Sequence, residues 1–208
     1  MSLRFEPGGR GGRPHLDRLG VVLDALYADA PRLERWGHQL ADALVAGARL
    51  LAAGNGGSAA QAQHLTSELV GRYRDDRPAF SAISLSSEAS ALTAIGNDYG
   101  LDEIFARQVR AHGRPGDILV VLSTSGRSSN VVAAVEAANA AGLVTLALTG
   151  PAGSPVAQLS DDALCVASDH TATVQEIHLV CLHLICEAFD ARVEQSAMAA
   201  LRLPGEGP

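Results

Sequence analysis

The pattern of hydrophobic positions divides the chain into two parts. Residues 16–27 and 31–48 carry apolar side chains three or four positions apart, which is the spacing of one helix face. From Arg49 onward, short apolar runs alternate with glycine-containing loops and with longer stretches of helical spacing. This alternation is typical of proteins in which a helix connects each parallel strand to the next. The pattern therefore predicts two leading helices followed by an α/β unit.

Five short runs are apolar at consecutive positions, as strands are when helices cover both faces of the sheet. The predicted strands are Leu50–Ala53, Phe80–Leu85, Ile118–Leu122, Val144–Leu148 and Leu164–Ala167, and the helices after Arg49 are Ser58–Val70, Glu88–Ile95, Glu103–Ala111, Ser129–Ala141 and about Thr173–Arg192. The fold class expected from these elements is α/β, a three-layer α/β/α sandwich with a five-stranded parallel sheet.

Both ends of the chain have compositions that do not favour packed structure. Residues 1–14 are rich in glycine and arginine, and the last five residues are PGEGP. We therefore expect a disordered tail at 1–14, a flexible tail at 198–208 and a single domain at 15–197. A chain of 208 residues, 47% of them hydrophobic, is long enough to bury one substantial core.

The composition argues against several classes of function. A net charge of −7 leaves no excess of positive charge to neutralise a nucleic-acid backbone. The three cysteines lack metal-type Cys-x-x-Cys spacing and lie in apolar surroundings, which fits a reducing compartment. The sequence shows no apolar stretch approaching the roughly 20 residues of a membrane span, and the first residues lack the apolar core of a signal peptide. We expect a cytoplasmic protein that binds neither nucleic acid nor membrane.

Two loops between a predicted strand and a predicted helix have the composition of a phosphate site. The first is GNGGS at residues 54–58, where glycines let the backbone approach an anion at a helix N-terminus. It has neither the P-loop nor the dinucleotide-binding spacing. The second is STSGRSSN at residues 123–130, a run of hydroxyl donors. Either loop alone could be an ordinary capped turn, but together, at the carboxyl ends of strands, they predict a site for one phosphate monoester.

Candidate chemical groups lie on two predicted helices. His64 and Glu68 are four residues apart and therefore share a helix face. The late helix is otherwise apolar but carries four polar groups, which need partners where they are buried: Gln175, Glu176, His178 and His183. Spacing does not choose between the two late histidines, and a solvated pair with satisfied core histidines is the simpler explanation of each group taken alone.

Four motifs decide between these explanations. They are GNGGSAAQAQHLTSELVGRY, LTAIGNDYGLDEIFARQV, RPGDILVVLSTSGRSSNV and VQEIHLVCLHLICE. In them the chain from about Leu51 to Asp190 resembles the SIS-domain phosphoheptose isomerases, which interconvert sedoheptulose 7-phosphate and D-glycero-D-manno-heptopyranose 7-phosphate. Other SIS proteins share the serine loop, but H-x-x-x-E after GNGGS, together with Q-E-x-H-x-x-x-x-H, is characteristic of this branch. The resemblance implies the flavodoxin-like SIS fold.

The resemblance also implies roles for individual residues. Glu68 and His183 match the proton-transfer pair, which we interpret as base and acid of an enediol mechanism. One Zn²⁺ per subunit would be bound by His64, Glu68, Gln175 and His183. The family is tetrameric, with sites between subunits, so a homotetramer is expected. The residues matching positions around the sugar phosphate are Asn55, Gly56, Gly57, Ser58, Glu68, Asn97, Asp98, Ser123, Thr124, Ser125, Ser128 and Gln175.

Departures from the family pattern leave room for other functions. Arg127 replaces a common Asn, and Thr173-Val174 replace a basic residue and Ile, which puts the exact sugar in doubt more than the reaction. The alternatives are a non-catalytic SIS module that binds a partner protein, as regulators of the replication initiator do, a sugar-phosphate sensor, and an isomerase of another sugar phosphate. A purely structural module would have no need of the proton-transfer groups.

Overall fold

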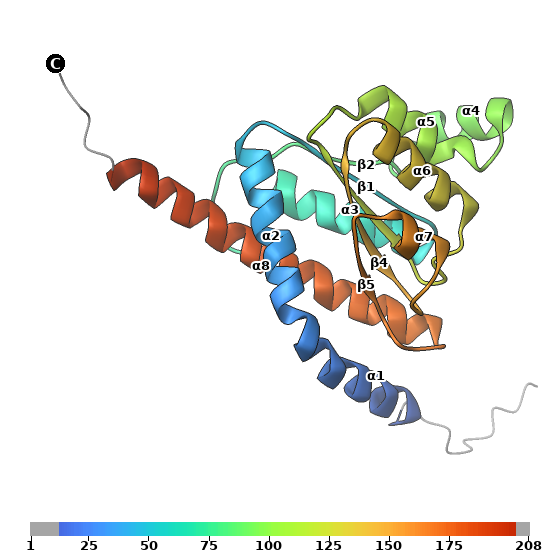
Figure 1. Ribbon diagram of the computed structural model, residues 1–208, viewed down its shortest axis with the longest axis horizontal. Helices are drawn as coiled ribbons and strands as arrows, with labels where there is room; N and C mark the ends of the chain where they lie inside the picture. The colour runs from blue at the N-terminus through green and yellow to red at the C-terminus, as the bar shows by residue number, and fades with distance from the viewer. Residues whose placement is uncertain (1–12, 203–208) are drawn as a thin grey trace, which may run out of the picture.

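The computed structural model describes the backbone of residues 13–202 and the side chains of residues 13–198 (Figure 1). Every predicted strand and helix has a counterpart. In chain order the elements are α1 (Arg13–Leu26), the 3-10 helix η1 (Tyr27–Asp29), α2 (Ala30–Val45), β1 (Leu50–Gly54), α3 (Gly57–Val70), β2 (Ala82–Ser84), α4 (Ala89–Tyr99), α5 (Glu103–His112), β3 (Ile118–Ser123), α6 (Ser129–Ala140), β4 (Val144–Thr149), α7 (Pro155–Leu159), β5 (Asp162–Cys165) and α8 (Thr171–Arg202).

The strands form one parallel sheet in the order β2-β1-β3-β4-β5. Successive residues of a strand point to opposite faces, so each central strand contributes to two cores. Leu50 and Ala52 of β1 belong to one hydrophobic cluster, whereas Leu51 and Ala53 belong to the other. Because both faces are covered, the strands need apolar residues at consecutive positions, and the predicted α/β/α sandwich is confirmed.

Each core is closed by its own set of helices (Figure 1). One cluster takes side chains from α1, α2, α3 and α8, including Trp36 and Phe189. The other takes side chains from α5, α6 and α7, with α4 at its margin through Leu92. As a result, α3 and α8 lie on the same side of the sheet, where they pack against each other.

Several element boundaries differ from the prediction, and one short helix was not predicted. The last strand is Asp162–Cys165, two residues earlier than the predicted Leu164–Ala167, and α4 continues to Tyr99 rather than Ile95. The short helix α7 was not predicted. Its start is marked in the sequence only by Ser154 and Pro155. Ser154 caps the helix by accepting from the Ala157 N–H at 3.4 Å, and Pro155 occupies the first turn.

The last helix is longer than predicted. We expected it to end near Arg192, with a flexible tail from residue 198, but α8 continues to Arg202. The segment SAMAALR at 196–202 consists largely of strong helix formers, which carry the helix onward. Residues 203–208 and residues 1–12 of the predicted tails lie outside the described residues, and α1 already begins at Arg13.

The expectation that no segment is long and apolar enough to cross a bilayer is wrong for α8. By length and composition alone, residues Thr171–Met198 could do so, with a mean hydropathy of 1.3 over the most apolar window. Half of that window is buried in the protein. A core helix of a soluble protein passes the same test, so this helix is weak support for a membrane span.

Two glycines make a matched test of helix packing. A methyl group on Gly37 of α2 would lie 2.5 Å from Cβ of Ala188 and 2.7 Å from the Ile185 carbonyl oxygen on α8, whereas one on Gly20 of α1 would meet nothing within 4 Å. We expect Gly37→Ala to lower the unfolding free energy by about 1–3 kcal/mol through overpacking. Gly20→Ala should raise it by roughly 0.5–1 kcal/mol. Urea unfolding of both variants tests this, and equal midpoints would contradict it.

Candidate active site

The two predicted phosphate loops leave the sheet side by side. Gly54, at the end of β1, pairs with Leu122 near the end of β3, so the loops that follow start from neighbouring strands. The side-chain amides of Asn55 and Asn130 join them, because each donates one hydrogen bond to the other, at 2.8 and 3.0 Å. The structure thus brings the glycine loop and the serine loop to one edge of the sheet.

The glycine loop has a backbone that depends on its glycines. Gly56 has a φ of +54°, in the left-handed region that favours glycine, and it precedes the first turn of α3. A Cβ on Gly57 would collide with the side-chain amide of Gln175. No side chain caps the N-terminus of α3, so its first N–H groups and its dipole are directed at the loop. Ser58, in that first turn, is buried.

The serine loop is ordered by its own hydroxyls. Ser123 Oγ is buried, accepts from the Gly126 N–H at 3.1 Å and lies 3.4 Å from Ser128 Oγ. Ser125 Oγ accepts from the Arg127 N–H at 3.2 Å. Ser128 occupies the N-cap position of α6 without a side-chain capping bond, so this second helix N-terminus also faces the loop.

Asn97 and Asp98 lie on the last turn of α4 and are exposed. Asn97 donates to Asp98 Oδ1 at 2.8 Å. Four residues later, Asp102 accepts from the Ser129 hydroxyl at the start of α6. The segment after α4 is therefore attached to the serine loop, while the side chains of Asn97 and Asp98 bond to each other.

The predicted proton-transfer groups lie where α3 faces α8. His64 Nε2 is 3.4 Å from Glu68 Oε1 on its own helix and 3.0 Å from His183 Nε2 across the interface. The two imidazole rings are arranged edge to face, with centroids 5.3 Å apart. All three side chains are partly exposed, so a ligand can reach them. The early helix and the late helix therefore contribute to one cluster within a single chain.

His178 has a different environment. It is fully buried, and its Nε2 lies 3.1 Å from the Thr149 carbonyl oxygen at the end of β4. Burial disfavours the charged imidazole and lowers the pKa of His178 to about 4, although the carbonyl opposes this shift. His178 is thus a core histidine that is neutral at physiological pH. Of the two late histidines that spacing could not separate, only His183 lies beside His64.

Gln175 lies about two turns before His183 on α8. Its side-chain amide lies against Gly57, and its backbone carbonyl oxygen accepts from Gln61 Nε2 at 2.6 Å. It therefore lies beside the glycine loop. No group of three or more His, Cys, Asp or Glu side chains is arranged to hold a metal ion in the described part of the chain. The zinc ligand set remains a prediction.

Two residues that no sequence pattern had singled out, Tyr73 and Arg77, lie beside this cluster. The ring of Tyr73 lies 5.8 Å from the ring of His183, and Arg77 donates to the Glu68 carbonyl oxygen at 2.6 Å. Burial, followed by the nearby Glu187 carboxylate, raises the pKa of Tyr73. Tyr73 ends the first family motif, which was the available signal. Arg77 lies beyond that motif and offered no pattern.

Known proteins resemble the chain closely. The SIS domain family matches residues 16–150. A phosphoheptose isomerase of Streptomyces coelicolor is 62% identical over 186 residues, covering 89% of this chain and 80% of that protein. One from Thiobacillus denitrificans is 48% identical, covering 81% of this chain and 87% of the relative. The solved structure of the phosphoheptose isomerase from Neisseria gonorrhoeae superposes with a TM-score of 0.79 at 38% identity, over 86% of this chain and 96% of that one.

The burial of His178 predicts a pH-dependent stability. Its pKa is about 4 when folded and near the ordinary histidine value of 6.5 when unfolded, so between these values the unfolded chain binds more protons. The contribution of neutral His178 to the unfolding free energy is therefore fully present above pH 6.5, and it is lost progressively as the pH drops toward 4. Between pH 7.5 and pH 5, this group should remove about 2 kcal/mol of unfolding free energy.

His178→Gln should remove this pH-dependent component, whereas His112→Gln, at an exposed position on α5, should retain it. Denaturant unfolding of both variants and of the parent chain at the two pH values measures it. The same pH dependence in His178→Gln as in the parent chain would contradict the assignment.

Proposed function

The chain belongs to the phosphoheptose isomerases of the SIS-domain family, and we propose from this that it interconverts sedoheptulose 7-phosphate and D-glycero-D-manno-heptopyranose 7-phosphate through an enediol. The observation that carries the proposal is the cluster of Glu68, His64 and His183, in which His64 Nε2 lies 3.4 and 3.0 Å from its two neighbours. An aldose–ketose isomerisation needs a base and an acid at adjacent carbons and no external redox partner.

The phosphate group is bound, in this proposal, between the two loops. The N-termini of α3 and α6 present backbone N–H groups and the positive ends of their dipoles, and the serine hydroxyls add donors. No net positive charge is required for a single monoester. Asn55 and Asn130 hold the two loops in register.

The length of the substrate fits the distance from the loops to the chemical groups. Gly57 begins α3 and His64 lies seven residues later, about 10 Å along the helix axis. A seven-carbon sugar carries its phosphate at C7 and reacts at C1 and C2, so the extended chain spans a comparable length. The phosphate would rest at the start of α3, and the reacting carbons would lie beside Glu68.

The proton transfers are assigned to Glu68 and His183. The Glu68 carboxylate removes the proton from C1 of the ketose, and His183 protonates the carbonyl oxygen at C2, which gives the enediol. The same carboxylate then delivers its proton to C2, while His183 takes the proton of the C1 hydroxyl. Atoms and charges balance over the two steps. His64, in contact with both side chains, holds them in position.

A zinc ion is part of the proposal because the donor chemistry fits. Two imidazoles and a carboxylate are preferred zinc ligands, and these three side chains lie next to one another, with His64 Nε2 3.4 Å from Glu68 Oε1 and 3.0 Å from His183 Nε2. His64, Glu68 and His183 would hold the ion. Gln175, the fourth ligand implied by the resemblance, has its side-chain amide against Gly57, about two turns of α8 before His183, and so lies outside this cluster. When bound, the ion would polarise the carbonyl group and stabilise negative charge on the enediolate oxygens.

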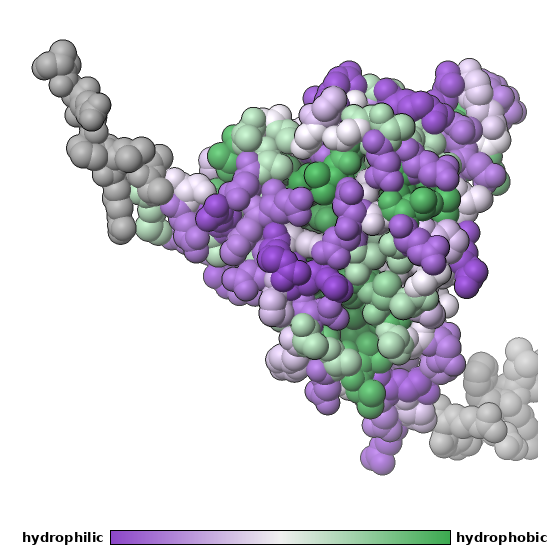
Figure 2. Space-filling view, viewed as in Figure 1, coloured by the Kyte–Doolittle hydropathy of each residue, from purple (hydrophilic) through white to green (hydrophobic). Residues whose placement is uncertain are grey.

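A homotetramer in the cytoplasm is also proposed, with active sites between subunits. Its support is apolar surface on the helices that cover the sheet, visible over α1 in Figure 2. Val21 is 70% exposed and Tyr27 81% exposed. A groove of about 460 Å³ beside them is lined by α1, η1 and α8, through residues such as Leu23 and Leu184. Side chains of this kind are usually covered in an oligomer.

The Glu68→Gln variant tests the assignment of the base. It keeps the size of the side chain and its contact with His64 but cannot accept the C1 proton, so kcat should fall by at least about 10²-fold. Binding of sedoheptulose 7-phosphate, measured by calorimetry, should change little. Glu136→Gln, an exposed carboxylate on α6, is the matched control and should keep full turnover.

Assays with sedoheptulose 7-phosphate and with fructose 6-phosphate identify the substrate class. Turnover of the seven-carbon sugar alone is the expected result. If Glu68→Gln retains turnover, the base is another residue, and if the parent chain acts on neither sugar, the proposed function is wrong.

Removal of metal tests the zinc site separately. Treatment with a chelator should lower both the isomerisation rate and the thermal midpoint, because ligand binding to the folded state stabilises it. Addition of Zn²⁺ should restore both quantities, and His64→Ala should abolish the response. An unchanged rate and an unchanged midpoint would exclude a resident metal.

A further inference from the structure

Arg77, in the loop after α3, is a buried cation with an unusually complete set of partners. Its side chain is only 7% exposed. The Nε group donates to Asp190 Oδ1 on α8 at 2.7 Å. Its Nη atoms donate to the carbonyl oxygens of Glu68 at 2.6 Å, Leu69 at 3.0 Å and Pro78 at 3.0 Å.

The guanidinium group is also enclosed by aromatic rings. It lies 5.4 Å from the ring centroid of Phe80 and 5.3 Å from that of Phe189, and these two rings contact each other edge to face. Enclosure of this kind removes water and fixes the plane of the guanidinium. The orientation of its N–H groups is therefore determined by packing as well as by hydrogen bonds.

Stability alone gives a weak reason for this arrangement. A charge is costly to bury, and an apolar group of the same shape often stabilises a protein as well. What distinguishes the arginine is the identity of its partners. Glu68 and Leu69 belong to the last turn of α3, whose carbonyl groups have no partner within the helix. Asp190 lies two turns after His183 on α8, so it shares a helix face with that residue.

We propose that Arg77 is a positioning residue for the isomerisation, because it ties the end of α3 that carries Glu68 to the part of α8 that carries His183. This inference rests on the proposed function. The fork geometry of a guanidinium lets one side chain bond to both helices at once, which an ammonium group cannot reproduce. The clamp therefore sets the separation of base and acid without contacting the substrate.

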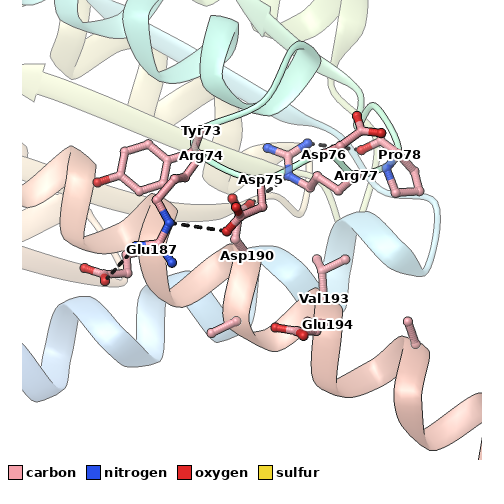
Figure 3. A pocket seen from close by; sticks show the side chains of 12 residues that line it. Tyr73, Arg74, Asp75, Asp76, Arg77, Pro78, Glu187, Asp190, Val193 and Glu194 are labelled. Carbon is pink, nitrogen blue, oxygen red and sulfur yellow. Dashed lines mark hydrogen bonds and ion pairs between the residues drawn. The ribbon is translucent and has the colours of Figure 1, made fainter.

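The surroundings of Arg77 are consistent with this role. Figure 3 shows Arg77 reaching from the loop toward α8, beside a cavity of about 480 Å³. The same loop carries Tyr73, whose ring lies against His183. Arg74 lies on the same loop and lines the same cavity, but it is well exposed and pairs with Asp75 and Glu187 at the surface.

The test compares Arg77→Lys with Arg74→Lys in the full-length chain. Arg77→Lys keeps the charge but loses the fork, so kcat for sedoheptulose 7-phosphate should fall about tenfold or more, with KM within about threefold, because misplaced catalytic groups slow the chemical step. Arg74→Lys should leave both constants within about twofold. Rates are measured below the thermal midpoint of each variant, so that loss of folded protein does not contribute.

If Arg77→Lys does not fold, the kinetics of the Asp190→Asn variant test the same proposal. Its side-chain oxygen can still accept from Nε, but the charge is lost, and kcat should fall severalfold with KM unchanged. Wild-type kcat in a folded Arg77→Lys variant would overturn the proposal. So would wild-type kcat in Asp190→Asn if the lysine variant does not fold. An inactive parent chain would instead reject the proposed function.

Discussion

The parallel packing of α3 against α8 is the constraint on which the site depends. Both helices begin at the carboxyl edge of the sheet, on the same face. At their N-terminal ends, Gly57 contacts the Gln175 amide. About two turns later the rings of His64 and His183 meet, and beyond α3 Arg77 bonds to Asp190. Each contact joins a residue near α3 to one about 115 positions later. The register of the two helices thus decides which late side chain meets His64, the neighbour of Glu68.

The register of the two helices keeps the proposed phosphate-binding loops apart from the proposed proton-transfer groups. In the substrate, the phosphate and the reacting carbons are likewise at opposite ends of the chain. The N-termini of α3 and α6 and the two loops offer dipoles and N–H groups to an anion, while the proposed proton-transfer groups lie further along α3 and on α8. In the proposed mechanism, α3 would therefore be a spacer of fixed length between the phosphate and the reacting carbons. The two glycines have different roles in the glycine loop. Gly56 gives the loop its left-handed turn, and Gly57 leaves room for the Gln175 side chain.

Much of the fold, and part of the site, could be predicted from the sequence. Consecutive apolar runs identified the strands, because a sheet covered on both faces needs them, and the two loops followed from glycine and serine at strand ends. Spacing could not separate His178 from His183, since that choice depends on whether a residue faces the sheet or α3. Arg77 was missed because its partners are mostly backbone carbonyl groups, which leave no mark on the sequence. The continuation of α8 beyond Arg192 was hidden by the glycines and prolines that follow it.

The fold and the phosphate loops would serve a sugar-phosphate sensor as well as an enzyme, since both must hold the same anion. What a sensor does not require is a carboxylate and two imidazoles in contact with one another about 10 Å along α3 from the loop proposed to bind the phosphate. A histidine with only a packing role can be buried singly, as His178 is, with its Nε2 against the Thr149 carbonyl oxygen. The convergence of Glu68, His64 and His183 at the α3–α8 interface, reinforced by a buried arginine that the core does not need, is therefore the feature that favours catalysis over recognition.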